Sequence, residues 1–186
     1  CNEIGLDLLA SLEAMLDALL NEESLQGPRA LVMYSAQPKG FCAGADLRQL
    51  YQGIVDRPAN EHVPALRSFL DRIHRVMDRL ASLPMTTVAA IHGVCFGGGF
   101  ELALACDLRF AAAGITLGLT ESRIGALPGA GGTQRLPRLI GVSRALQMML
   151  SGEPVSSEYA LNIGLVNEVM AAAELETRAQ AFAQLL

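Results

Sequence analysis

The sequence predicts an α/β fold in which helices cover a largely parallel sheet. Short apolar runs typical of buried strands alternate along the chain with stretches of helical periodicity. Such alternation favours strand–helix–strand units over an all-β or all-α fold. The 186 residues are enough to bury one core, so we expect a single domain over residues 1–186.

The first half of the chain begins with an amphipathic helix and contains one buried strand. Helical spacing of apolar residues predicts the helices, and an apolar run after a Gly-Pro turn predicts the strand. Glycine, prolines and asparagine between the two later helices predict a loop. In order, the expected elements are helix Leu6–Leu20, strand Ala30–Ser35, a helix from Asp46 or Leu47, loop Gln52–Pro64, and helix Ala65–Leu83 stopped by Pro84.

The second half alternates more quickly between short strands and short helices. Buried strands are expected at Thr86–Ile91, Leu108–Ala112, Ile115–Leu119 and Leu165–Met170. Helices are expected at Gly99–Cys106, Thr133–Ile140, Ser143–Leu150, Ser157–Asn162 and from Glu174 to Leu186.

Composition narrows the class of protein. With 51% hydrophobic and 18% charged residues, the chain is expected to fold, and its net charge of −5 argues against a nucleic-acid partner. The four cysteines form no Cys-x-x-Cys pair and have no histidine at metal spacing, which predicts reduced thiols in a cytosol-like compartment and no metal site. No charge-free apolar run reaches the roughly 18–20 residues of a membrane span, and no signal peptide is recognisable.

Glu101 and Glu121 are candidates for acid–base chemistry, because paired carboxylates can act as acid and base. Glu101 follows the Gly97–Gly99 triplet in an apolar segment, where a carboxylate is costly to bury unless it is hydrogen-bonded. Glu121 is expected at the end of a strand. Taken alone, Glu101 also fits an acid at a helix N-terminus, and Glu121 fits an exposed loop residue.

Three glycine-rich turns could bring backbone N–H groups close to a ligand: Cys42–Asp46, Gly97–Gly99 and Gly129–Gly132. The second and third do not fit Gly-x-Gly-x-x-Gly, because Leu102 and Gln134 stand at the third glycine position. This pattern disfavours a nucleotide-phosphate loop. Main-chain donors for a carbonyl oxygen and plain tight packing both remain open.

Other motifs carry less chemistry. The absence of Gly-x-Ser-x-Gly counts against a hydrolase nucleophile elbow. The three histidines, His62, His74 and His92, have no evident partner and are expected to be solvated or to sit in turns. Asp46 and Asp107 are expected to cap or brace turns.

Taken together, the motifs resemble the crotonase superfamily and, within it, enoyl-CoA hydratases. The matching stretches cover nearly the whole chain in the right order: Phe41–Leu47, Ile91–Ala103, Gly118–Glu121 and Leu127–Pro137. The resemblance implies a spiral of β-β-α units. It also implies that an N-terminal hairpin and C-terminal helices are missing from this chain, which starts at Cys1 rather than Met, so we expect both ends to be trimmed.

The resemblance also implies a division of roles. The backbone N–H groups of Ala45 and Gly98 would form an oxyanion hole, Glu121 would give the α-proton, and Glu101 would orient and activate the water. The loop from Gln52 to Pro64 would shape the acyl pocket. The substrate-binding residues implied are Ala43, Ala45, Asp46, Leu47, Arg48 and Gly98.

The implied substrate is an acyl-CoA thioester, and the implied reaction is reversible hydration of a 2-enoyl-CoA. No separate cofactor is implied, because coenzyme A is part of the substrate. The resemblance implies a homotrimer or a dimer of trimers for the full-length protein, in the cytoplasm or, if the source is eukaryotic, in the mitochondrial matrix. Two alternatives remain: another crotonase reaction, such as isomerisation, dehydration or decarboxylation, and a non-catalytic acyl-CoA- or RNA-binding protein.

Overall fold

A computed structural model describes residues 1–20 and 29–186, and its core consists of two four-stranded sheets. The first sheet has the order β1-β3-β5-β8 and is parallel throughout, with strands Ala30–Met33, Thr86–Ile91, Leu108–Ala112 and Glu168–Met170. The second has the order β2-β4-β6-β7, with strands Gly40–Cys42, Val94–Phe96, Thr116–Gly118 and Val155–Ser156. Its last pair, β6 and β7, is antiparallel.

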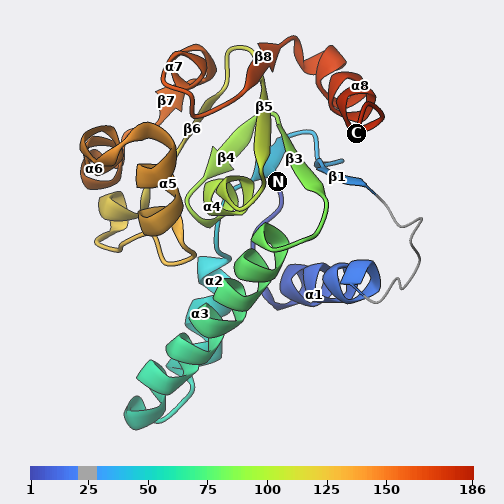
Figure 1. The fold of residues 1–186 in the computed structure, drawn as a ribbon. Helices are drawn as coiled ribbons and strands as arrows, with labels where there is room; N and C mark the ends of the chain where they lie inside the picture. Colours follow the sequence, from blue (N-terminus) through green and yellow to red (C-terminus); the bar gives the residue numbers. More distant parts are fainter. Residues whose placement is uncertain (21–28) are drawn as a thin grey trace.

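From β1 to β6 consecutive strands alternate between the two sheets, and each pair of strands is followed by a helix, so a β-β-α order repeats along this part of the chain (Figure 1). Figure 1 shows α4 close to the strands at the centre of the molecule, whereas α3 projects away from them. The helices are α1 (Leu6–Leu20), α2 (Leu47–Val55), α3 (Ala59–Ala81), α4 (Gly98–Leu104), α5 (Gly132–Ile140), α6 (Val142–Ser151), α7 (Ser157–Asn162) and α8 (Ala172–Ala183). A 3₁₀ helix, η1, spans Glu121–Ile124.

Both faces of the parallel sheet are covered, which explains the continuous apolar runs of β3 and β5. Side chains alternate along each strand: Ala89 and Ile91 belong to the main core, while Val88 and Ala90 pack in a smaller cluster with α8. Alanines on these strands leave room for helices to approach closely. Within the described residues, no helix is long and apolar enough to cross a bilayer.

The loop predicted for Gln52–Pro64 is wrong. Helix α2 continues to Val55, and α3 begins at Ala59 rather than Ala65. Pro64 therefore lies inside a helix as its sixth residue, where it removes one backbone hydrogen bond near the start of α3. The glycine, prolines and asparagine in this stretch predicted a long break between the two helices, but the break is a turn of only three residues.

Three short strands, β2, β4 and β7, had no counterpart in the sequence prediction. Each has three residues or fewer, which is too short for an alternating pattern to show. The strand predicted at Ile115–Leu119 is trimmed to Thr116–Gly118. As a result Glu121 begins a 3₁₀ helix instead of ending a strand.

Candidate active site

Strand β4 leads into α4 through a turn whose backbone conformation and close packing require glycine. Gly97 has φ +52°, in the region that favours glycine. A Cβ added at Gly99 would lie 2.2 Å from the carbonyl oxygen of Cys42. Helix α4 thus starts in direct contact with the end of β2, and two segments distant in sequence meet there.

This contact brings the amides of Ala45 and Gly98 together. A Cβ added at Gly98 would lie 3.4 Å from the Ala45 nitrogen, and one added at Gly44 would lie 3.3 Å from the Gly98 nitrogen. Among residues 1–20 and 29–186, neither amide donates to another protein group, whereas their neighbours do: Asp46 N–H donates to the Ile4 carbonyl. Two adjacent unpaired N–H groups, one of them at a helix N-terminus, suit an oxygen that carries negative charge.

Glu101 is 2% exposed and is held by two backbone amides. Its Oε1 accepts hydrogen bonds from Ala130 N–H at 2.8 Å and from Gly132 N–H at 2.7 Å. Burial raises the pKa of the Glu101 carboxyl, while the amides of Gly132 and Ala130 and the charge of Arg135 oppose that rise. The Gly129–Gly132 turn therefore serves as a cradle for a carboxylate, since both donors favour the charged form.

Glu121 approaches the same place from η1. A Cβ added at Gly97 would lie 3.3 Å from Glu121 Oε1, so this carboxyl is next to the turn that positions Gly98. Glu121 Oε2 is buried and has no hydrogen-bond partner within the described chain. Burial raises the pKa of Glu121 to about 7, and the nearby charge of Glu101 adds to that rise. Burial thus raises the pKa of both carboxyls, but Glu101 accepts two amide hydrogen bonds on Oε1, whereas Oε2 of Glu121 has no partner within the described residues.

The remaining predicted binding residues surround the start of α2. The side chain of Asp46 caps this helix by accepting from the Gln49 amide at 2.8 Å, as its predicted capping role requires. Ala43, Leu47 and Arg48 are exposed. The sequence prediction missed Arg135, whose guanidinium donates to the Ala130 carbonyl at 3.0 Å. An arginine four residues after Gly131, one helical turn into α5, was the available signal.

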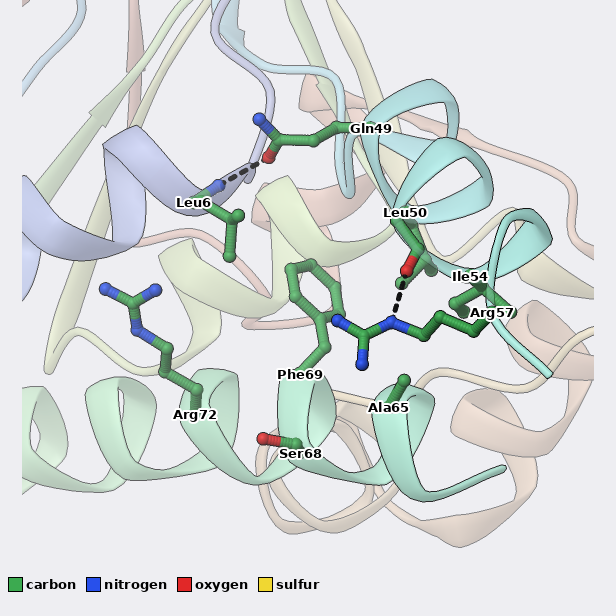
Figure 2. Close-up of a pocket in the computed structure, with 10 residues that line it drawn as sticks. Leu6, Gln49, Leu50, Ile54, Arg57, Ala65, Ser68, Phe69 and Arg72 are labelled. Atoms are coloured by element: carbon green, nitrogen blue, oxygen red, sulfur yellow. Dashed lines mark hydrogen bonds between the residues drawn. The ribbon is translucent and has the colours of Figure 1, made fainter. Parts of the chain in front are cut away.

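A cavity of about 290 Å³ lies between the start of α1 and one face of α2 and α3 (Figure 2). Its lining includes Leu50, Gly53, Ile54 and Arg57 of the α2 region and Phe69 of α3. Neither Glu101 nor Glu121 lines it. The cavity therefore does not include the carboxylate pair, although α2 begins two residues after Ala45.

No group of three or more His, Cys, Asp or Glu side chains in the described part of the chain is arranged to hold a metal ion. His92 lies between β3 and β4, with its Nε2 3.0 Å from the Gln37 carbonyl oxygen. Asp107 braces the sheet, because its Oδ2 accepts from both the amide and the hydroxyl of Thr87 at 2.8 Å.

Comparisons with known proteins agree with this geometry. A family model described as enoyl-CoA hydratase/isomerase matches residues 6–186. Mouse mitochondrial methylglutaconyl-CoA hydratase is 38% identical over 169 residues, which cover 91% of this chain and 50% of that protein. An enoyl-CoA isomerase/hydratase from Penicillium crustosum is 39% identical over 171 residues, which cover 92% of this chain and 19% of that protein.

Among solved structures, an enoyl-CoA hydratase from Bacillus anthracis superimposes with a TM-score of 0.86 at 38% identity, covering 98% of this chain and 66% of that one. The chain thus spans about half the length of the mouse hydratase. These findings confirm the predicted fold class and the predicted resemblance. The chain belongs to the enoyl-CoA hydratase/isomerase family of the crotonase superfamily.

Proposed function

We propose that this chain forms the catalytic core of an enoyl-CoA hydratase, which adds water reversibly across the double bond of a 2-enoyl-CoA thioester. The observation that carries the proposal is the contrast between the two carboxyls. Glu101 accepts two amide hydrogen bonds that favour its ionised form, whereas Glu121 has a buried, unpartnered oxygen and a pKa of about 7. This contrast in hydrogen bonding suits Glu101 to act as the base and Glu121 to act as the acid.

In this proposal the thioester oxygen accepts hydrogen bonds from the amides of Ala45 and Gly98. As water adds to C3, the electrons of the C2=C3 bond move toward the thioester oxygen, which gains enolate charge. The two amides stabilise that charge without reorganising. Loss of one such donor typically costs about 3–4 kcal/mol of transition-state stabilisation.

Glu101 takes a proton from the attacking water while the new C3–O bond forms. Glu121 then delivers its proton to C2, which restores the thioester carbonyl and completes the 3-hydroxyacyl product. Proton exchange between the two carboxyls and solvent resets the pair. We propose Ala43, Asp46, Leu47 and Arg48 as further acyl-CoA-binding residues, because they flank Ala45 and three of them are exposed.

The test is the hydration of crotonyl-CoA by the purified protein, followed by loss of absorbance of the conjugated thioester. Glu101→Gln and Glu121→Gln keep the size of the side chain and should each lower kcat by roughly 10²–10⁴-fold. Glu174→Gln, an exposed glutamate on α8, is the matched control and should retain parent activity. Parent-like turnover in both site variants would overturn the proposed roles.

Isomerisation of the double bond is the second candidate, because the Penicillium crustosum relative is named an isomerase/hydratase. Mass spectrometry of the products separates the two reactions, since hydration adds one water to the thioester and isomerisation leaves the mass unchanged. The trimeric assembly, the compartment and the absence of a nucleic-acid partner stay predictions from the sequence.

A further inference from the structure

Arg135 contacts the carboxylate cradle from behind. The Nη1 of Arg135 donates to the Ala130 carbonyl at 3.0 Å, and the Ala130 amide donates to Glu101 Oε1 at 2.8 Å. Ala130 is thus held from both sides, by a guanidinium on its carbonyl and by a carboxylate on its N–H. A shift of the Arg135 side chain would therefore move the Ala130 amide, which orients the carboxylate of Glu101.

Gly131 makes room for this guanidinium. Its φ is +101°, and a Cβ at this position would lie 2.1 Å from Arg135 Nη1. The guanidinium therefore packs on the α-carbon between the two amide donors of the cradle. This contact requires glycine at position 131, both for the backbone conformation and for the space.

Asp78 of α3 completes the arrangement. Its Oδ1 accepts from Arg135 Nη2 at 2.8 Å, and the Arg135 side chain is only 18% exposed while that of Asp78 is 75% exposed. The pair ties the cradle to α3, a helix whose Leu70 side chain also lies against Gly129. Asp78 fixes the orientation of the guanidinium from the solvent side.

Within the described residues, few charged or titratable groups face Glu101. The carboxyl of Glu121 approaches from η1, and the guanidinium of Arg135 approaches from α5. Arg135 is therefore the positive charge that opposes the desolvation of Glu101. Its removal would leave a buried carboxylate beside a second carboxyl.

We infer that Arg135, oriented by Asp78, is a positioning residue that holds the Ala130–Gly132 amides on Glu101 and places a positive charge beside the Glu101 carboxylate. This inference rests on the hydratase function proposed above. It assigns to Arg135 no contact with substrate. The guanidinium acts through the loop and through its charge.

The first test is the pH dependence of kcat for Arg135→Gln, Arg135→Lys and Asp78→Asn. Arg135→Gln should lower kcat on the order of 10- to 100-fold with little change in KM, and should move the acidic limb of the profile to higher pH, because Glu101 would bind its proton more tightly. Arg135→Lys keeps the charge, so the acidic limb should return toward that of the parent. Asp78→Asn should give a smaller loss of kcat.

Arg138→Gln is the matched control. Arg138 lies on the same helix, is exposed and donates to the Gln134 carbonyl, so the variant makes the same change in net charge without touching the cradle. It should match the parent in kcat, KM and pH profile. An Arg135→Gln variant with an unmoved acidic limb, measured well below its own Tm, would overturn the inference.

The second test does not need turnover. In protein labelled with ¹³C at the glutamate side-chain carboxyls, NMR titration should show Glu101 taking up a proton at higher pH in Arg135→Gln than in the parent. If the parent hydrates no enoyl thioester, the proposed function fails while this titration still decides the role of Arg135. If Arg135→Gln does not fold, both measurements are made on Arg135→Lys and Asp78→Asn instead. A parent-like titration of Glu101 in Asp78→Asn, together with a parent-like kcat in both variants, would then overturn the inference.

Discussion

The carboxyl of Glu121 lies against the α-carbon of Gly97, so that a Cβ added there would come within 3.3 Å of Glu121 Oε1. Gly97 caps α4, whose first amide belongs to Gly98, and the Gly97 carbonyl accepts from the Glu101 amide at 2.9 Å. Gly97 therefore lies next to the proposed acid, precedes the proposed oxyanion donor Gly98 and accepts a hydrogen bond from the proposed base, Glu101. The site is compact because this position has no side chain.

Gly97→Ala should consequently impair catalysis more than folding. The new methyl would displace Glu121 and strain a backbone with φ +52°, so we expect kcat to fall about 100-fold and the free energy of unfolding to fall by about 1–2 kcal/mol. Steady-state kinetics and urea unfolding measure the two effects. Gly114→Ala is the matched control, since Gly114 has φ +74° and open space around it. This variant should lose a similar free energy of unfolding through backbone strain and should keep the parent kcat.

Gly99→Ala should destabilise the whole fold. Its Cβ would meet the Cys42 carbonyl at 2.2 Å, and backbone cannot move aside as a flexible side chain can. We expect a loss of about 3 kcal/mol or more in urea unfolding, because α4 would be pushed away from β2. Gly53→Ala in α2, with no atom within 4 Å of the added Cβ, should instead be neutral or stabilising by up to about 1 kcal/mol. Equal unfolding midpoints for the two variants would contradict this account.

Glu121 should make stability depend on pH. Its folded pKa of about 7 exceeds the ordinary 4.5, so the folded state binds a proton more tightly than the unfolded state. The stabilisation that the protonated Glu121 carboxyl contributes to the folded state is fully present below pH 4.5, and it is lost as pH rises to about 7. Because the carboxyl is only partly buried, we expect Glu121→Gln to gain about 1–2 kcal/mol relative to the parent on going from pH 4.5 to pH 8. A stability difference that stays constant across this range would be evidence against a perturbed Glu121.

Arg109 should contribute strongly to stability, because its buried guanidinium satisfies several backbone carbonyls. It is 2% exposed, and its guanidinium donates to the carbonyls of Cys106 at 2.6 Å and Leu165 at 2.8 Å. Arg109→Met would leave these buried carbonyls without donors and should cost about 3 kcal/mol or more in chemical unfolding. Arg178→Met, a half-exposed arginine paired with Glu168 on the surface, should cost about 1 kcal/mol or less, and it serves as the comparison.

Much of the fold followed from local pattern. The helices Leu6–Leu20 and Ser157–Asn162 and the strands Thr86–Ile91 and Leu108–Ala112 agree with the prediction, because each has clear periodicity or clear flanking breakers. The short strands of the second sheet could not be predicted in this way. Their pairing depends on partners far along the chain, as between Cys95 and Leu117.

The sequence by itself determined which chemistry was available: two carboxylates, three glycine turns and motifs that together resemble one superfamily. The tertiary structure alone decided how these parts differ. Glu101 and Glu121 are both acid–base candidates in the sequence, yet Glu101 receives two amide donors from Ala130 and Gly132, whereas Glu121 keeps a buried oxygen without a partner within the described residues. The physical reason is that the pKa of a carboxyl depends on burial, donors and neighbouring charge, and here these come from residues up to 34 positions away, such as Arg135 beside Glu101.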